Sequence, residues 1–331
     1  MKKNRLNICY YPTSLILVDD NKKFLQSLRL GLSDYSCYFY ENPKKALDFI
    51  NNSYQYEPFI NRSLLSEEDS FIEQPVAGLN IKKIHHEIYN SNRYEEISVL
   101  LADYSMPYMN GAEFCKEIKS KYLRKVMLTG EASNELAIVA FNEGIINKFI
   151  LKSSIGFLNV IMDNIQELQE NYFIALTDIS LSKINKNNVL SIIEDPVFIE
   201  LFNKLCRKHQ IVEYYLLDEQ GSYLLLDKNK KMKWLIVKKE LELQNLTNFA
   251  AFEEAPEPIL NALQNREKLP YFHTEVEIAE PPSEWEKYLY PAVKLHGKEL
   301  YYYSFIDDLT PLNMEMEKIL SYSKFLDNLV I

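Results

Sequence analysis

Five polar side chains stand at the ends of apolar runs in the first half of the chain. Asp19 and Asp20 follow SLILV, and Asp103 follows ISVLLA. Thr129 closes the run KVML, and Lys152 follows KFIL. Phosphorylation of an aspartate requires such groups: a carboxylate nucleophile, oxygen ligands for a hard cation, and a hydroxyl and an ammonium that bind phosphoryl oxygens.

The carboxylates differ in their expected roles. Asp103 stands alone after its run and is the predicted nucleophile. Asp19 and Asp20 are predicted to hold Mg²⁺, which prefers oxygen ligands, and the backbone carbonyl of Ser105 is a further candidate ligand. Taken singly, aspartates at strand ends are often solvated turn residues. The ordered set of acids, hydroxyl and ammonium is what indicates a site.

These residues need elements that bring distant strand ends together. Apolar runs alternate five times with segments of helical periodicity. The predicted strands are 14–20, 37–40, 97–102, 125–128 and 148–151, and the predicted helices are 21–32, 43–50, 111–121, 135–143 and 157–176. The alternation predicts an α/β fold with a five-stranded, parallel, doubly wound (flavodoxin-like) sheet, because parallel connections need crossovers. Ligands of such sheets lie at the carboxyl ends of the strands.

Four motifs carry a family resemblance: LVDDN, LLADYSMPYMNG, VMLTGEA and KFILKS. In this order and spacing they resemble the CheY-like receiver domains of two-component response regulators, over about residues 13–174. The resemblance implies that Asp103 is the phosphoacceptor and that Thr129 and Lys152 couple phosphorylation to the far face. It implies that Phe149 is the switch aromatic. It also implies a sensor histidine kinase or phosphotransfer protein as partner, and a homodimer after phosphorylation.

Two features depart from a minimal receiver. Ser153 follows Lys152 where receivers typically have proline, so we expect a trans bond or a strained loop, since a cis bond without proline costs about 2.5–4 kcal/mol. Residues 54–96 form an insertion with an amphipathic segment near 79–89. A late acceptor after such an insertion, with an unassigned second half, is similar to the response regulators of α-hydroxyketone quorum-sensing circuits.

The second half has a different pattern, which follows a polar linker expected at 175–188. Residues 189–331 predict an α+β domain with a largely antiparallel sheet. The expected strands are 213–217, 223–226, 234–237, 271–278, 288–295 and 300–306, and the expected helices are 189–207, 241–252, 257–264 and 314–329. The first two strands, joined by a glycine-containing turn, have the pattern of a hairpin.

Three functions are open for this second domain. The first is an output module that binds a partner or ligand. The second is an enzyme with nucleotide or hydrolytic chemistry that uses acids within 213–307, and the third is a DNA-binding regulator. A net charge of −10 disfavours nucleic acid, because binding to phosphates needs clustered Lys and Arg. The densest lysine cluster, at 228–239, is interpreted first as a solvated turn and strand edge. No convincing catalytic motif is present.

Weaker signals have ordinary structural explanations. His85 and His86, which precede Glu87, are expected to form a surface histidine pair and not a metal site. Tyr301–Tyr303 fits a strand with alternating faces better than a platform for bases. Asp218, Asp227 and Lys230 loosely resemble a nuclease site, but the acid-to-lysine spacing is one residue too long and a supporting acid is missing.

The composition also bears on the compartment. Four cysteines lie far apart and form no CxxC pair, so neither a zinc site nor a disulfide framework is expected. A reducing cytoplasm is the simple interpretation. Uncharged apolar runs of about 18 residues are absent, and no transmembrane helix is expected.

Overall fold

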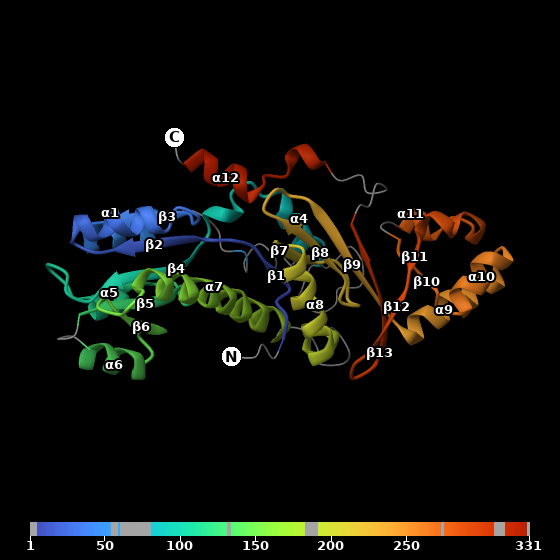
Figure 1. The fold of residues 1–331 in the computed structure, drawn as a ribbon, viewed down its shortest axis with the longest axis horizontal. Coiled ribbons are helices and arrows are strands. Elements are labelled where there is room, and N and C mark those ends of the chain that lie inside the picture. Colours follow the sequence, from blue (N-terminus) through green and yellow to red (C-terminus); the bar gives the residue numbers. More distant parts are fainter. Residues whose placement is uncertain are drawn as a thin grey trace. The chain divides into compact units, whose positions relative to one another are not determined.

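The computed structural model describes residues 5–53, 59, 81–130, 134–182, 191–272, 275–307 and 315–329 of the 331. Contacts divide the described residues into two units (Figure 1). The parallel-sheet unit takes those of 11–66, 90–183 and 320–331, and the antiparallel-sheet unit takes those of 1–10, 67–89 and 184–319. None of the described helices is both long enough and apolar enough to cross a lipid bilayer.

The parallel-sheet unit is built on five strands, all paired in parallel. They are β2 (Ser14–Val18), β3 (Cys37–Tyr40), β4 (Ile97–Asp103), β5 (Arg124–Thr129) and β6 (Lys148–Leu151). Their order in the sheet is β3-β2-β4-β5-β6. The central strands β2 and β4 are buried along their whole length, as parallel strands covered on both faces require. The predicted flavodoxin-like fold is confirmed.

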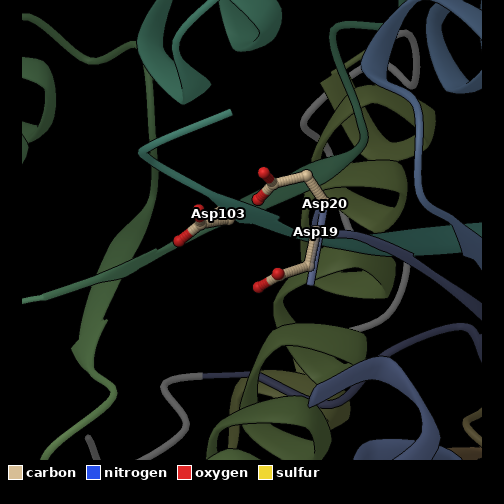
Figure 2. A group of neighbouring side chains, drawn as sticks. All are labelled: Asp19, Asp20 and Asp103. Carbon is tan, nitrogen blue, oxygen red and sulfur yellow. The ribbon is translucent and has the colours of Figure 1, made fainter. Parts of the chain in front are cut away.

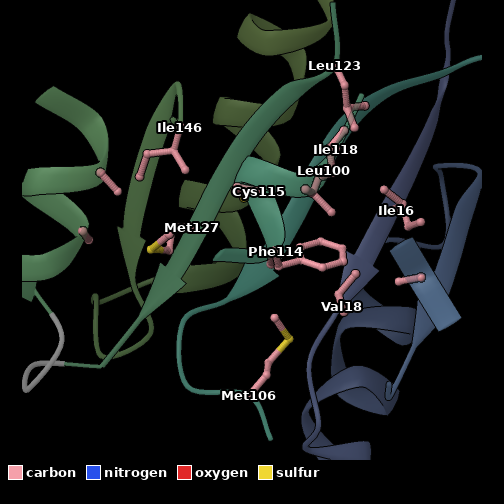
Figure 3. Packing of buried hydrophobic residues seen from close by; sticks show 14 of the residues in the cluster. Ile16, Val18, Leu100, Met106, Phe114, Cys115, Ile118, Leu123, Met127 and Ile146 are labelled. Atoms are coloured by element: carbon pink, nitrogen blue, oxygen red, sulfur yellow. The ribbon is translucent and has the colours of Figure 1, made fainter. Parts of the chain in front are cut away.

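Helices cover both faces of this sheet. One face packs against α1 (Lys22–Gly31) and α7 (Phe157–Ser182). The other packs against α2 (Pro43–Asp48), α5 (Gly111–Glu117) and α6 (Asn134–Asn142); a π-helical segment, Phe49–Ser53, follows α2. Figure 3 shows this second cluster, in which Phe114 of α5 lies near Val18 of β2. Two apolar clusters therefore fix the sheet from both sides.

Asparagine side chains start three of these helices. The side chains of Asn21, Asn42 and Asn110 accept backbone N–H bonds at the first turns of α1, α2 and α5. Asn110 completes a capping box with Glu113. Such caps satisfy donors that have no partner within the helix, and so they fix the residue at which each helix begins.

Helix α7 extends six residues beyond its predicted end at residue 176, to Ser182. Polarity in this stretch indicated a linker, but Thr177 and Ser180 are buried, and the Ser180 hydroxyl donates to the Leu176 carbonyl. A hydroxyl bonded back to the preceding turn is compatible with helix. The expected linker start at residue 175 is therefore wrong, and residues 183–188 lie outside the described part.

The antiparallel-sheet unit contains a six-stranded sheet in the order β1-β7-β8-β9-β13-β12. Its strands are β1 (Cys9–Tyr10), β7 (Ile211–Leu216), β8 (Tyr223–Asp227), β9 (Met232–Lys239), β12 (Val293–His296) and β13 (Leu300–Ile306). Every pairing is antiparallel. A separate pair joins β10 (Lys268–Pro270) to β11 (Leu289–Pro291). The expected α+β class with a largely antiparallel sheet is confirmed.

Helices of this unit are α4 (Ile81–His86), α8 (Pro196–Lys208), α9 (Glu240–Phe252), α10 (Glu257–Gln264) and α11 (Glu275–Ile278). Short 3₁₀ segments cover Glu87–Tyr89, Ser191–Glu194, Pro282–Tyr288 and Met316–Lys318. The predicted helix at 189–207 is interrupted at Pro196, which is the first residue of α8 and follows the N-cap residue Asp195. In the insertion, only part of the amphipathic segment near 79–89 is described; residues 54–58 and 60–80 are not.

Two predicted strands are wrong. Residues 275–278 form α11, because a short alternation of polar and apolar residues does not distinguish a helical turn from a strand. The stretch 288–295 does not form one strand but splits into β11 and β12, which belong to different sheets. Pro291 has no N–H to continue a ladder, and the next residue, Ala292, donates to the carbonyl of Glu267.

The predicted terminal helix at 314–329 is also interrupted, and its second part, α12 (Tyr322–Leu329), packs within the parallel-sheet unit. The Arg93 guanidinium, in a 3₁₀ turn (Arg93–Glu95) at the end of the insertion, donates to the Leu320 carbonyl at 2.7 Å. Tyr94 meets Phe325 with ring centroids 5.2 Å apart. The Leu320 carbonyl is bonded to Arg93 and does not serve as a helix acceptor, so the predicted helix is interrupted before α12. Because α12 belongs to the parallel-sheet unit, that unit is discontinuous in sequence.

Replacing Phe325 by alanine should lower the free energy of unfolding by about 3 kcal/mol, because the side chain is 6% exposed and its loss leaves a cavity beside Tyr94. Chemical denaturation followed by near-UV circular dichroism measures the change. Leu329→Ala, at a side chain 52% exposed in the same helix, is the control. Equal effects of both variants would show that α12 does not pack as described.

Gly111→Ala should destabilise the parallel-sheet unit by about 1–3 kcal/mol. An alanine Cβ would lie 2.4 Å from the backbone oxygen of Asp103 and 3.0 Å from Cα of Tyr104, and backbone cannot give way as a flexible side chain can. Gly130→Ala is the control, since its Cβ would meet nothing within 4 Å. Thermal unfolding of both variants measures the difference, and an unchanged Gly111→Ala protein would contradict the close approach.

Candidate functional site

The polar residues at the strand ends meet at one edge of the parallel sheet. Val18, the last residue of β2, pairs with Ala102 of β4, so Asp19 and Asp103 emerge side by side. Asp103 pairs with Leu128 of β5. In turn, Thr129 pairs with Leu151, immediately before Lys152. The parallel register therefore gathers residues that are more than 130 positions apart in sequence.

Three carboxylates form the centre of this edge. Asp19, Asp20 and Asp103 each offer an oxygen, and these oxygens lie within 4.8 Å of one another. Figure 2 shows the three side chains at the ends of β2 and β4, with their carboxylates directed toward the same space. Asp19 and Asp103 are buried, and Asp20 is exposed. Among the described residues, this is the only group of three or more acids, histidines or cysteines with such spacing.

Lys152 bridges two of these acids. Its Nζ lies 2.7 Å from Oδ2 of Asp19 and 2.6 Å from Oδ1 of Asp103. Burial alone would lower the pKa of Lys152, but the hydrogen bonds to Asp103 and Asp19 outweigh burial and raise it. Burial raises the pKa of Asp19, and the hydrogen bond from Lys152 only partly opposes this. The ammonium is thus the fixed cation of the site.

Backbone donors orient the two bridged acids. Oδ1 of Asp19 accepts the N–H of Asn21 at 2.8 Å, and Oδ2 of Asp103 accepts the N–H of Ser105 at 3.1 Å. Each acid therefore gives one oxygen to the backbone and the other to Lys152. Ser105 itself is exposed. With both oxygens engaged, neither buried carboxylate is free to rotate out of the site.

Thr129 and Phe149 lie beside the acids without contacting them. Thr129 is fully buried, and its hydroxyl donates to the carbonyl of Gly130 at 2.9 Å. Phe149 pairs with Met127 on the neighbouring strand, which places its side chain on the same face as Thr129. It is half-buried and meets Phe141 of α6 edge to face at 6.4 Å.

The turn after Lys152 contains no cis bond. Peptide bonds of the described residues are all trans, the Lys152–Ser153 bond included, which is one of the two outcomes expected without proline. The Lys152 N–H donates to the Thr129 carbonyl at 2.9 Å, and that of Phe157 donates to Ser154 at 3.1 Å. Gly156 takes a positive φ of 67°, and α7 begins at the next residue.

Two residues that contact the site from outside were not among the predicted ones. Asn21 orients Asp19 and also caps α1, and an asparagine directly before a helical pattern is the signal that indicates this. Phe24 lies on α1 with its ring centroid 4.6 Å from Nζ of Lys152. Its helical spacing indicates only that it faces the protein; nothing local in the sequence places it against Lys152.

The two acids and the lysine that loosely resemble a nuclease site have structural roles. Asp218 accepts the N–H groups of Gln220 and Ser222 within its turn, and Asp227 does the same for Asn229 and Lys231. The Lys230 ammonium donates to two backbone carbonyls, those of Met316 and Ile319. These contacts account for the residues that loosely resemble a nuclease site.

The remaining aromatic and histidine candidates are accounted for in the same way. Tyr301 and Tyr302 are buried in the middle of the antiparallel sheet and offer no open platform for bases. His85 lies against His86 with ring centroids 5.1 Å apart. In the part of the chain that the structure describes, these histidines and Glu87 form no metal-ligand group.

Comparison with known proteins finds a solved structure that matches nearly the whole chain. The structure of the Legionella pneumophila response regulator LqsR is 33% identical, with a TM-score of 0.80, and the match covers 98% of this chain and 96% of that one. A CheY-like receiver domain protein from Methanospirillum hungatei JF-1 is 18% identical, with a TM-score of 0.33, and the match covers 49% of this chain and 96% of that one. No family model and no curated protein matches. The chain belongs to the same family of response regulators as LqsR of Legionella pneumophila.

Proposed function

We propose that Asp103 accepts a phosphoryl group from a sensor histidine kinase or a phosphotransfer protein. In this step an oxygen of the Asp103 carboxylate forms a bond to phosphorus, while the bond between phosphorus and the donor breaks and its electron pair leaves with the donor. The observation that carries the proposal is the bridge of Lys152 between Asp103 and Asp19 at 2.6 and 2.7 Å. It places a fixed cation where phosphoryl oxygens would come to lie.

The three carboxylates also have the donor atoms and the spacing to bind a hard divalent cation. Asp19, Asp20 and Asp103 supply only oxygen donors, which Mg²⁺ prefers. Asp20 is exposed and has no ion-pair partner among the described residues, so it can bind a cation without breaking an existing bond. A bound Mg²⁺ would neutralise charge on the phosphoryl group. The carbonyl of Ser105 is the further ligand in this proposal.

Phosphorylation would change the charge at the sheet edge. A phosphoryl group brings roughly −1.5 to −2 charges and strong acceptor oxygens, and the hydroxyl of Thr129 and the ammonium of Lys152 are the nearby donors. Thr129 would exchange its bond to Gly130 for one to the phosphoryl group. Phe149, on the same face of the sheet, would then turn inward. A shift of a few kcal/mol between two arrangements is enough for a switch.

Helix α6 offers the surface on which this switch would act. Four of its apolar side chains are 41–51% exposed: Leu136, Ile138, Val139 and Phe141. Apolar residues gathered on one exposed helix mark an interaction site, and Phe141 contacts the switch residue Phe149. We propose that a second copy of the chain binds here after phosphorylation.

The antiparallel-sheet unit is proposed to be the output module. We place the receiver from about residue 13 to the end of α7 at Ser182, with the insertion at 54–96, and the output unit from 189 onward; α12 belongs to the receiver. Partner binding is favoured over catalysis because the acids Asp218 and Asp227 are engaged in turns. The proposed signalling context is an α-hydroxyketone quorum-sensing circuit.

The Asp103→Asn variant should take up no label from radioactive acetyl phosphate in the presence of Mg²⁺, whereas the unmodified chain should be labelled. Asparagine keeps the shape but lacks the nucleophilic oxygen. Removing Mg²⁺ with EDTA should abolish labelling of the unmodified chain as well. Asp163→Asn, at an exposed acid of α7, is the control and should label normally. Undiminished labelling of Asp103→Asn would show that the acceptor is another residue.

Val139→Lys should prevent the phosphorylation-dependent dimer, because it puts a charge among the exposed apolar side chains of α6. Sedimentation velocity with and without acetyl phosphate measures the dimer. Leu30→Lys is the matched control, since Leu30 is 82% exposed on α1 of the same unit. A phosphorylated Val139→Lys protein that still dimerises would place the interface elsewhere.

A further inference from the structure

The Lys152 ammonium has a third neighbour besides its two carboxylates. Its Nζ lies 4.6 Å from the ring centroid of Phe24, a half-buried residue in the first turn of α1. A cation over the face of an aromatic ring is attracted by the ring quadrupole. The ammonium is therefore held by Asp19 and Asp103 on one side and by an aromatic face on another.

The same ring contacts the start of the long helix. Phe24 and Phe157 have ring centroids 5.7 Å apart with an interplanar angle of 41°. Phe157 is the first residue of α7 and packs into the apolar cluster that also holds Ile161 and Ile165. Helix α7 has 26 residues, which corresponds to about 39 Å at 1.5 Å per residue.

The turn between Lys152 and Phe157 is short and contains no proline. Only four residues separate them, and the first is Ser153, which lacks the rigid ring of a proline. Backbone bonds from Ser154 to Leu151 and from Phe157 to Ser154 keep the turn compact. The aromatic pair is thus a second, non-covalent connection between Lys152 and α7, alongside the short turn.

We infer that Phe24 is a positioning residue that holds Lys152 in the resting site and transmits its displacement through Phe157 to α7. The inference deepens the proposed function and rests on it. When Asp103 carries a phosphoryl group, the ammonium moves toward the new oxygens and away from the ring face. Phe24 and Phe157 then repack, and the first turn of α7 changes its packing on the sheet. This route is separate from the one through Thr129 and Phe149.

A second aromatic–cation pair in the same cluster provides the control. The Arg29 guanidinium lies 4.8 Å from the ring centroid of Phe39, on β3. Phe39 and Phe24 are both half-buried and belong to the same apolar cluster. Arg29 contacts none of the three acids, so Phe39→Leu removes the same kind of contact without touching the proposed route.

The experiment measures hydrogen–deuterium exchange of the full chain by mass spectrometry, with and without acetyl phosphate and Mg²⁺. In the unmodified chain, phosphorylation should change exchange in peptides covering 154–162. Phe24→Leu, which keeps apolar volume but loses the ring face, should remove most of that change. Its phosphoryl incorporation should stay within about 5-fold of the unmodified chain, the scale of one partly exposed cation–π contact. Phe24→Tyr keeps the ring and should restore the response.

The outcomes separate the inference from the proposed function. If the unmodified chain takes up no phosphoryl group, both fall. If Phe24→Leu is phosphorylated and still shows the full exchange response, the relay through Phe24 is overturned while the acceptor assignment stands. Phe157→Leu is the second variant and should also lose the response at normal incorporation. An equal loss in Phe39→Leu would overturn the relay, because it would assign the effect to general loosening of the cluster.

Discussion

The ion bridge of Lys152 between Asp19 and Asp103 is the constraint around which the parallel-sheet unit is arranged. The two acids are 1% and 5% exposed, and a buried carboxylate without a partner costs several kcal/mol. The bridge and the backbone donors of Asn21 and Ser105 supply those partners. All these groups belong to strand ends or to the first residues beyond them. A shift of one strand in register would leave a buried charge unpaired, so the site and the sheet specify each other.

Helix α7 connects the edge that carries this bridge with the opposite edge of the sheet. It begins at Phe157, whose ring contacts that of Phe24, and Phe24 in turn contacts the Lys152 ammonium. Farther along, the hydroxyl of Tyr172 donates to Glu96, a buried acid just before β4 that also accepts from Tyr11. Buried networks of this kind are costly to leave partly satisfied. The helix is therefore held at its middle by buried polar contacts and at its start by aromatic packing.

The two units are not simply consecutive in sequence. The described residues of 1–10 join the antiparallel sheet through β1, and α12 joins the parallel-sheet unit after the second unit is complete. The likeness to LqsR extends over 98% of the chain and includes both units. The antiparallel-sheet unit thus belongs to the architecture that the family shares. Because the chain passes from one unit to the other more than once, neither unit is a single continuous segment of the sequence.

The sequence by itself determined the class of both sheets and the placement of Asp19, Asp20, Asp103 and Lys152 at one edge, because burial on two faces gives continuous apolar runs and parallel strands end together. It also indicated the helix starts, since caps act locally. Only the tertiary structure decided what covers each apolar face: the packing of α12, the length of α7, the division of 288–295 between two sheets, and the contact of Phe24 with Lys152. Periodicity records that a side chain is buried, but the partner that buries it comes from a distant part of the chain.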